Sequence, residues 1–230
     1  MSKMFKSIKE IKIKDYIKPI IIISALFIGF VAFDQVSKYV AEYYLTGQGT
    51  VPFIPGFIDF KLVYNKGAAW GMGDGAIWSR VLLCSISWVV FIGLPIYIIY
   101  LMTKGKKLNT LFTVCLGLVL AGDFGNLIDR TFFFDRGVID FISIQSWLPG
   151  FVIFNIADSC LVVGVILLLV YFIIEEINEQ RAQKAKNEEA LKKAKELDEN
   201  AKKVESSENA TLNAGQSNNK VEEIKENERK

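Results

Sequence analysis

Long runs of apolar residues alternate with short polar stretches through the first three quarters of this chain. Four apolar segments stand out, and they are Pro19–Phe33, Val81–Met102, Leu108–Ala121 and Phe151–Ile174. A bilayer core about 30 Å thick needs roughly 20 helical residues to cross it. The second and fourth segments reach that length alone, and the first and third reach it only if the polar residues that follow them are helical. The pattern therefore predicts four membrane-spanning helices, with polar ends that face protein or water rather than lipid.

The distribution of lysine predicts the orientation of these helices. Six lysines precede the first apolar segment, and Lys104, Lys106 and Lys107 lie between the second and third. By the positive-inside rule both regions are cytoplasmic, so both termini are expected in the cytosol and the two longer loops outside. The first segment lacks a small-x-small cleavage site, which favours a retained helix over a cleaved signal peptide.

The loop after the first helix has the composition of a small sheet. Residues 51–64 mix β-branched and aromatic residues around the turn pair Pro55-Gly56, which predicts short strands on the outer side of the membrane. We therefore expect an all-α membrane protein, a four-transmembrane-helix bundle with a small extracytoplasmic β-sheet and a polar, partly helical or disordered C-terminal tail. The expected divisions are a basic N-terminus (1–18), a four-span domain (19–176) with outer loops at about 43–80 and 123–150, and a charged cytosolic tail (177–230).

Composition excludes several kinds of chemistry. The chain has no histidine, so Ser-His-Asp and Cys-His catalysis and all histidine-based zinc sites are ruled out. The three cysteines, Cys84, Cys115 and Cys160, lie in apolar segments without Cys-x-x-Cys spacing, and they are interpreted as packing residues. We expect no metal and no cofactor.

Two aspartates are the strongest candidates for chemistry. Asp158 is the eighth residue of the fourth apolar segment, counted from Phe151, which places it on the order of 10 Å down the expected helix, and Asp140 lies just before that segment. A carboxylate within a membrane-spanning helix is costly and usually functional. Two carboxylates close together share a proton, so that one acts as a base toward water and the other as an acid toward a carbonyl oxygen. This pair predicts an aspartyl hydrolase.

Further polar clusters lie toward the same, outer side of the predicted bundle. Asp34 with Lys38, and Asn126 with Arg130, are spaced i,i+4, and Asn155 with Asp158 are spaced i,i+3, so each pair shares a helix face. Simpler interpretations exist: a helix-end ion pair for Asp34 and Lys38, amide bridges between helices for the asparagines, and an interfacial ion pair for Asp129 and Arg130. The spacing alone leaves these alternatives open.

Taken together, five blocks resemble the conserved motifs of lipoprotein signal peptidase, the type II signal peptidase of bacteria. They occur in that family's order between Pro19 and Ile174, with departures at Trp70, Ala121 and Asp123, and they are Asp34–Lys38, Asn65–Gly71, Ala121–Arg130, Val138–Phe141 and Phe154–Asp158. The resemblance implies an aspartic endopeptidase of the bacterial cell membrane that cleaves prolipoproteins before a cysteine carrying a diacylglyceryl group.

The resemblance also implies roles for individual residues. Asp140 and Asp158 would be the catalytic pair. The residues implied to bind substrate or support the pair are Asp34, Lys38, Asn65, Gly67, Asn126, Arg130 and Asn155. The expected partners are the lipidated signal peptide and membrane lipid, with no nucleic acid, and the enzyme is expected to be a monomer with its active site toward the outer leaflet.

Two other classes of function compete. A small proton-coupled transporter would also carry aspartates within a bundle, but here the polar residues gather toward one leaflet and no inverted repeat is evident. A membrane scaffold would explain the charged tail but leaves both aspartates unexplained.

Overall fold

The computed structural model describes residues 13–67 and 76–227, with side chains up to residue 196. Its elements, in chain order, are a short 3-10 helix η1 (Ile13–Asp15), α2 (Ile17–Leu45), β1 (Val51–Ile54), β2 (Ile58–Asn65), α3 (Ile77–Thr103), α4 (Thr110–Phe132), β3 (Val138–Ser143) and α5 (Ile156–Asn227). The chain divides into two compact units, Met1–Phe172 and Ile173–Lys230.

Helices α2, α3, α4 and the first part of α5 are each long and apolar enough to cross a membrane, which confirms the four predicted spans. Helix α4 lies at the centre of the bundle, because 72% of its most apolar stretch is buried, against 6%, 11% and 17% in α2, α3 and α5. Its core contacts include Leu116 and Leu120, which pack with Ile98 and Leu101 of α3. The apolar side chains exposed on α2 and α3 form the surface available to lipid.

Glycines allow α5 to approach α4 closely. A Cβ atom added to Gly122 of α4 would lie 2.5 Å from the Ala157 carbonyl oxygen, and one added to Gly164 of α5 would lie 2.9 Å from the Val119 side chain. Small residues at such contacts are typical of membrane helices, where close backbone packing holds the helices together.

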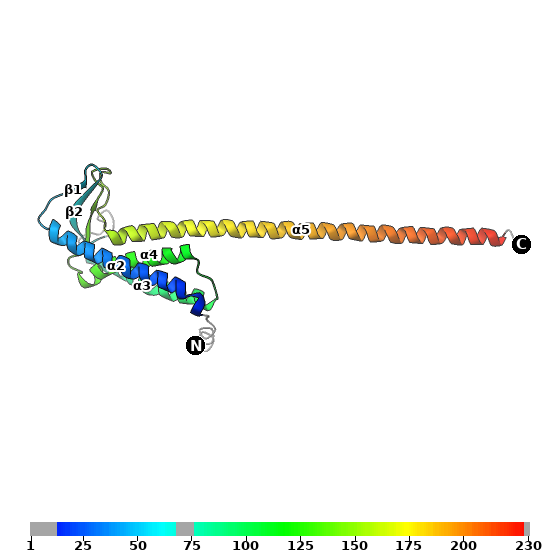
Figure 1. Ribbon diagram of the computed structural model, residues 1–230, viewed down its shortest axis with the longest axis horizontal. Helices are drawn as coiled ribbons and strands as arrows, with labels where there is room; N and C mark the ends of the chain where they lie inside the picture. The colour runs from blue at the N-terminus through cyan, green and yellow to red at the C-terminus, as the bar shows by residue number, and fades with distance from the viewer. Residues whose placement is uncertain (1–12, 68–75, 228–230) are drawn as a thin grey trace. The chain divides into compact units, whose positions relative to one another are not determined.

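A three-stranded antiparallel sheet in the order β1-β2-β3 lies at the end of the bundle where α2 finishes (Figure 1). The β1–β2 connection contains Gly56 with a φ of 76°, a conformation that glycine adopts readily. These strands match the predicted sheet. Phe141 and Ile139 of β3 pack with Ala41 and Leu45 of α2, so the sheet is fixed to the bundle by apolar contacts.

Two boundaries and one strand differ from the expectation. Helix α4 continues to Phe132, because its polar residues 122–130 face other helices. Strand β3 was not predicted, although Val138-Ile-Asp-Phe-Ile has the β-branched and aromatic composition of a strand. Helix α5 begins at Ile156 rather than Phe151, because Phe154 exchanges backbone hydrogen bonds of 2.8 and 3.0 Å with Ile142 and thus extends the sheet.

In the second unit α5 continues as a helix to Asn227. Every described side chain from 173 to 196 is exposed. Contacts at i,i+4 run along this surface, including an ion pair of 2.7 Å between Lys193 and Glu189. The helical part of the polar tail is therefore confirmed.

Candidate active site

The first turn of α5 presents Asp158 through a reciprocal pair of hydrogen bonds. The Asn155 side-chain oxygen accepts from the Asp158 backbone N–H at 2.9 Å, and the Asp158 carboxylate accepts from the Asn155 backbone N–H at 3.1 Å. This is a capping box, in which residues at N-cap and N3 satisfy each other's free amides. Asp158 is half-buried in the first helical turn. The expectation that it lies well down the helix was wrong, because residues 151–155 are not helical and α5 begins only at Ile156.

Strand β3 carries the other aspartate. Asp140 is 2% exposed, and its register partner on β2 is Val63. One carboxylate oxygen accepts from the Asn65 amide at 2.9 Å, and the other accepts from the Asn155 amide at 2.8 Å. Asn155 therefore bridges the two acids, with its side chain on Asp140 and its backbone on Asp158.

Asn65 is held by the turn that follows β2. Its side-chain oxygen accepts from the Gly67 backbone N–H at 3.0 Å, as in an Asx-turn. This leaves the amide nitrogen facing Asp140. Gly137 has a φ of 87°, and a Cβ there would lie 2.6 Å from the Asn65 carbonyl oxygen, so only glycine fits beside this turn without strain.

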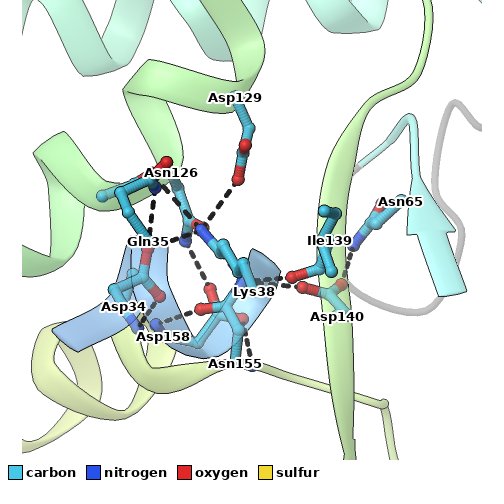
Figure 2. A network of polar contacts seen from close by, with 12 residues as sticks. Asp34, Gln35, Lys38, Asn65, Asn126, Asp129, Ile139, Asp140, Asn155 and Asp158 are labelled. Atoms are coloured by element: carbon cyan, nitrogen blue, oxygen red, sulfur yellow. Dashed lines mark hydrogen bonds and ion pairs between the residues drawn. The ribbon is translucent and has the colours of Figure 1, made fainter. Parts of the chain in front are cut away.

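Asn126 of α4 contacts the other carboxylate. Its amide nitrogen donates to Asp158 at 2.7 Å, while its oxygen accepts from Lys38 at 2.9 Å and from Asn155 at 3.0 Å. Two donors at the oxygen fix the orientation of this amide. Figure 2 shows residues from α2, α4, β2, β3 and α5 converging in this single network.

Lys38 is the buried cation of the network. Its ammonium lies 2.8 Å from Asp34 and 2.8 Å from Asp129, and all three side chains are at most 2% exposed. Removing one partner from a buried ion pair typically costs about 3–5 kcal/mol, because a charge is left uncompensated. The ion pair predicted between Asp34 and Lys38 is therefore present, within a larger cluster.

Asp34 also connects α2 to the start of α5. Its carboxylate accepts from the Ala157 backbone N–H at 2.8 Å, one of the amides that have no partner within the helix. A negative charge at this position is favoured by the helix dipole. Gln35 donates to Asp34 at 3.1 Å and to the Gly125 carbonyl at 2.9 Å, so α2, α4 and α5 are tied at one level.

The environment of Asp140 favours its protonated form. Burial, together with the nearby charge of Asp158, raises the pKa of Asp140 from 3.8 to about 7, against the lowering effect of the Asn65 hydrogen bond. At neutral pH such a carboxyl group exchanges its proton readily, which suits general acid–base catalysis. In aspartic hydrolases two neighbouring carboxyl groups likewise share one proton, because their pKa values are pushed apart.

Not every predicted site residue joins this network. Arg130 instead lines a small pocket with Asn65, Gly67 and Gly137. The alternative ion pair between Asp129 and Arg130 is wrong, because Asp129 pairs with Lys38 and with Arg136. Consecutive helical residues point about 100° apart, so the side chains of Asp129 and Arg130 do not face each other. Trp70 and Gly71 lie outside the described residues.

Sequence reasoning missed three contributors. Gln35 follows Asp34 directly, and Arg136 and Glu42 form an ion pair of 3.1 Å beside Asp129. Glu42 lies four residues after Lys38 on α2, and that i,i+4 spacing was the available signal. Nothing in the spacing indicated Arg136, which lies in the turn before β3.

Comparison with known proteins agrees with this architecture. The family model described as signal peptidase (SPase) II matches residues 26–174. A lipoprotein signal peptidase of Enterococcus faecalis is 37% identical over 166 residues, covering 72% of this chain and 92% of that protein. Another, of Listeria monocytogenes, is 36% identical over 149 residues, covering 65% and 91%.

Two solved structures are also similar. Both are described as bacterial membrane enzymes determined by the in meso method, at 2.3 Å and 1.9 Å resolution. The first has a TM-score of 0.56 and 32% identity, covering 70% of this chain and 90% of that one. The second has a TM-score of 0.54 and 33% identity, covering 67% and 92%.

Proposed function

The chain belongs to the signal peptidase II family, and we propose that its reaction is carried by Asp140 and Asp158 as an aspartic catalytic pair. The protein is a protease of the bacterial cell membrane that removes signal peptides from prolipoproteins. The transporter alternative has no support from these relatives. The observation that carries the proposal is that Asn155 hydrogen-bonds the Asp140 carboxylate through its side chain and the Asp158 carboxylate through its backbone.

The two environments favour different roles for the two acids. Asp140 is buried and has a pKa raised to about 7, so it is the member that retains a proton. Asp158 is half-buried, accepts hydrogen bonds from Asn126 and the Asn155 backbone, and is the more accessible of the two acids to an attacking water. Asp158 is therefore assigned as the base and Asp140 as the acid.

Peptide-bond hydrolysis follows from these roles. Asp158 takes a proton from a water molecule whose oxygen attacks the scissile carbonyl carbon, while Asp140 donates its proton to the carbonyl oxygen. In the resulting tetrahedral species the C–N bond breaks as Asp158 returns its proton to the departing amine. Asp140 regains a proton as the new carboxyl product forms.

The remaining polar residues have supporting roles in this proposal. Asn65 and Asn126 each orient one acid, and Asn155 spans both. Asp34 and Lys38 hold α2 and α4 against the start of α5. Gly67 fixes the Asn65 amide, and Arg130 lies in the pocket beside it, where a guanidinium suits a peptide carbonyl.

The proposed substrate is a prolipoprotein whose cysteine carries a diacylglyceryl group, cut on the N-terminal side of that cysteine by a monomeric enzyme. The site lies toward the outer leaflet, with both termini cytosolic, as the lysine distribution indicates. Exposed aromatic side chains gather at the sheet end of the bundle, where they suit the membrane–water interface, and they include Tyr43, Tyr44, Phe53, Phe57 and Trp147.

The test is cleavage of a diacylglyceryl-modified prolipoprotein peptide by the purified full chain in detergent, with a chelator present. Asp140→Asn and Asp158→Asn are each expected to lower kcat by about 10²–10⁴-fold, the usual contribution of an acid or base. Asp135→Asn is the matched control, because Asp135 is fully exposed. Cleavage at the control rate by either variant would remove that residue from the catalytic pair. Loss of cleavage on chelation would refute a metal-free mechanism.

A further inference from the structure

A series of ion pairs leads from the buried cluster to the surface. Lys38 lies 2.8 Å from Asp129, whose other oxygen lies 3.1 Å from the Arg136 guanidinium. The same guanidinium lies 3.1 Å from Glu42. Exposure rises along this series, from 2% for the side chains of Lys38 and Asp129 to 26% for Arg136 and 29% for Glu42. Arg136 therefore stands between the buried charges and solvent.

Arg136 is held in place by more than its ion pairs. Its guanidinium stacks on the Phe133 ring at 4.0 Å from the centroid, and its backbone N–H donates to the Phe133 carbonyl at 3.0 Å. Glu42 is fixed in turn, because the Tyr64 hydroxyl donates to it at 2.9 Å. A planar guanidinium with two carboxylate partners and an aromatic neighbour loses little freedom in making these bonds.

The charges of the buried cluster do not balance without Arg136. Lys38 provides one positive charge against the two negative charges of Asp34 and Asp129. Buried charge without a counter-charge is costly, and it also repels any other carboxylate nearby. Arg136 supplies the missing positive charge through Asp129.

We propose that Arg136 is a positioning residue for the cleavage reaction: it shares Asp129 with Lys38, so that Lys38 also holds Asp34 and Asn126, and it sets the charge that the Asp140–Asp158 pair experiences. Glu42 opposes this effect, because its negative charge partly cancels the positive charge of the Arg136 guanidinium. The inference rests on the proposed catalytic pair, since it assigns Arg136 a role only through those two acids.

Several elements contribute charges around the pair. Helix α2 contributes Asp34, Lys38 and Glu42, α4 contributes Asp129 and Arg130, and the turn before β3 contributes Arg136. Among these, Lys38 acts directly on Asp140 as a favourable charge. A change at Arg136 reaches the pair through the balance between Lys38 and Asp129.

The test is the pH dependence of kcat/KM for the full chain in detergent, on the same lipopeptide. Arg136→Gln is expected to move the acid limb upward by roughly half to one pH unit, because loss of a positive charge makes a carboxyl group harder to ionise. Glu42→Gln is expected to move that limb downward. Arg136→Lys, which keeps the charge, is expected to follow the wild-type profile. Arg181→Gln, on the exposed tail, is the matched control.

A purely structural role for Arg136 predicts a different pattern. Both Arg136 variants would then lower the rate at every pH without moving the limb, and this result would overturn the proposal. Movement of Glu42→Gln in the same direction as Arg136→Gln would also overturn it. If Arg136→Gln does not fold, the Glu42→Gln profile decides alone, since an unmoved limb there refutes the proposal.

Asp140→Asn in the same series separates this inference from the catalytic assignment. If Asp140→Asn is inactive and Arg136→Gln is unshifted, only the role of Arg136 fails. If Asp140→Asn cleaves at the wild-type rate, the catalytic pair itself fails.

Discussion

Asn155 and Asp158 hydrogen-bond each other in both directions, at 2.9 and 3.1 Å, across the first turn of α5. The same Asn155 amide donates to Asp140 of β3 at 2.8 Å. One residue thus begins the helix that carries one acid and holds the acid of the neighbouring strand. Helix capping and active-site geometry are joined at this residue.

Substitutions of Asn155 separate these two roles. Asn155→Ser keeps a good N-cap, whereas Asn155→Ala loses it, so the alanine variant should be less stable by about 1 kcal/mol. Both lose the amide that bridges the acids, and both should lose cleavage by about 10²-fold, the cost of a small misplacement of reacting groups. Thermal unfolding in detergent and the lipopeptide assay measure the two effects. Near wild-type cleavage by Asn155→Ser would contradict the bridging role.

Gly125 of α4 tests the close packing beside the site. A Cβ there would lie 2.8 Å from the Asp34 carboxylate and 2.9 Å from the Ala157 Cβ, whereas a Cβ at Gly29 of α2 would meet nothing within 4 Å. Gly125→Ala is therefore expected to destabilise by about 1–3 kcal/mol, as overpacking does, and to lower cleavage. Gly29→Ala should be neutral or slightly stabilising, because alanine favours helix. Equal midpoints of thermal unfolding for the two variants would show that small shifts of α2 and α5 accommodate the added methyl group without loss of stability.

The pKa of Asp140 predicts how stability depends on pH. Burial raises this pKa from 3.8 to about 7, so the folded state binds more protons than the unfolded state between these values. The contribution of Asp140 is therefore most favourable at low pH and is lost as the pH rises toward 7. The midpoint of thermal unfolding should fall from pH 5 to pH 8 in the wild type, and it should fall less in Asp140→Asn. Parallel curves would mean that Asp140 titrates normally in the folded protein.

The charged tail is expected to be dispensable for catalysis. The signal peptidase II match ends at residue 174, and every described side chain from 173 to 196 is exposed. A chain that ends after Glu179 should therefore cleave the lipopeptide with unchanged kcat/KM. The full chain in the same detergent is the control. A lower kcat/KM in the shortened chain would assign the tail a part in the reaction and would move the predicted domain boundary at 176.

The membrane spans and two of the site's contacts were predictable from the sequence. Apolar run length fixes the number of helices, and i,i+4 spacing predicted the Asp34–Lys38 ion pair that α2 contains. The i,i+3 spacing of Asn155 and Asp158 was also informative, although the two residues form a capping box at the start of α5 rather than lying together on one helix face. Local periodicity determines such contacts because both partners lie on one helix.

Contacts between elements were not predictable in the same way. Asp129 was paired with its neighbour Arg130 in one interpretation, but its partners come from α2 and from the turn before β3. The start of α5 was placed too early, because the apolar residues 151–154 suit a strand and a membrane helix equally well. Only the pairing of Phe154 with Ile142 distinguishes them, and that depends on the position of β3.

Each of the three asparagines at the site has its amide orientation fixed before any peptide arrives. Asn65 is set by Gly67, Asn126 by Lys38, and Asn155 by the Asp158 backbone. Folding has already removed the rotamer freedom of these side chains, so little more is lost when substrate binds. The entropic cost of assembling the reactive complex therefore falls mainly on the incoming signal peptide, and tight inhibitors of this enzyme should be those whose backbone is already rigid in the bound shape.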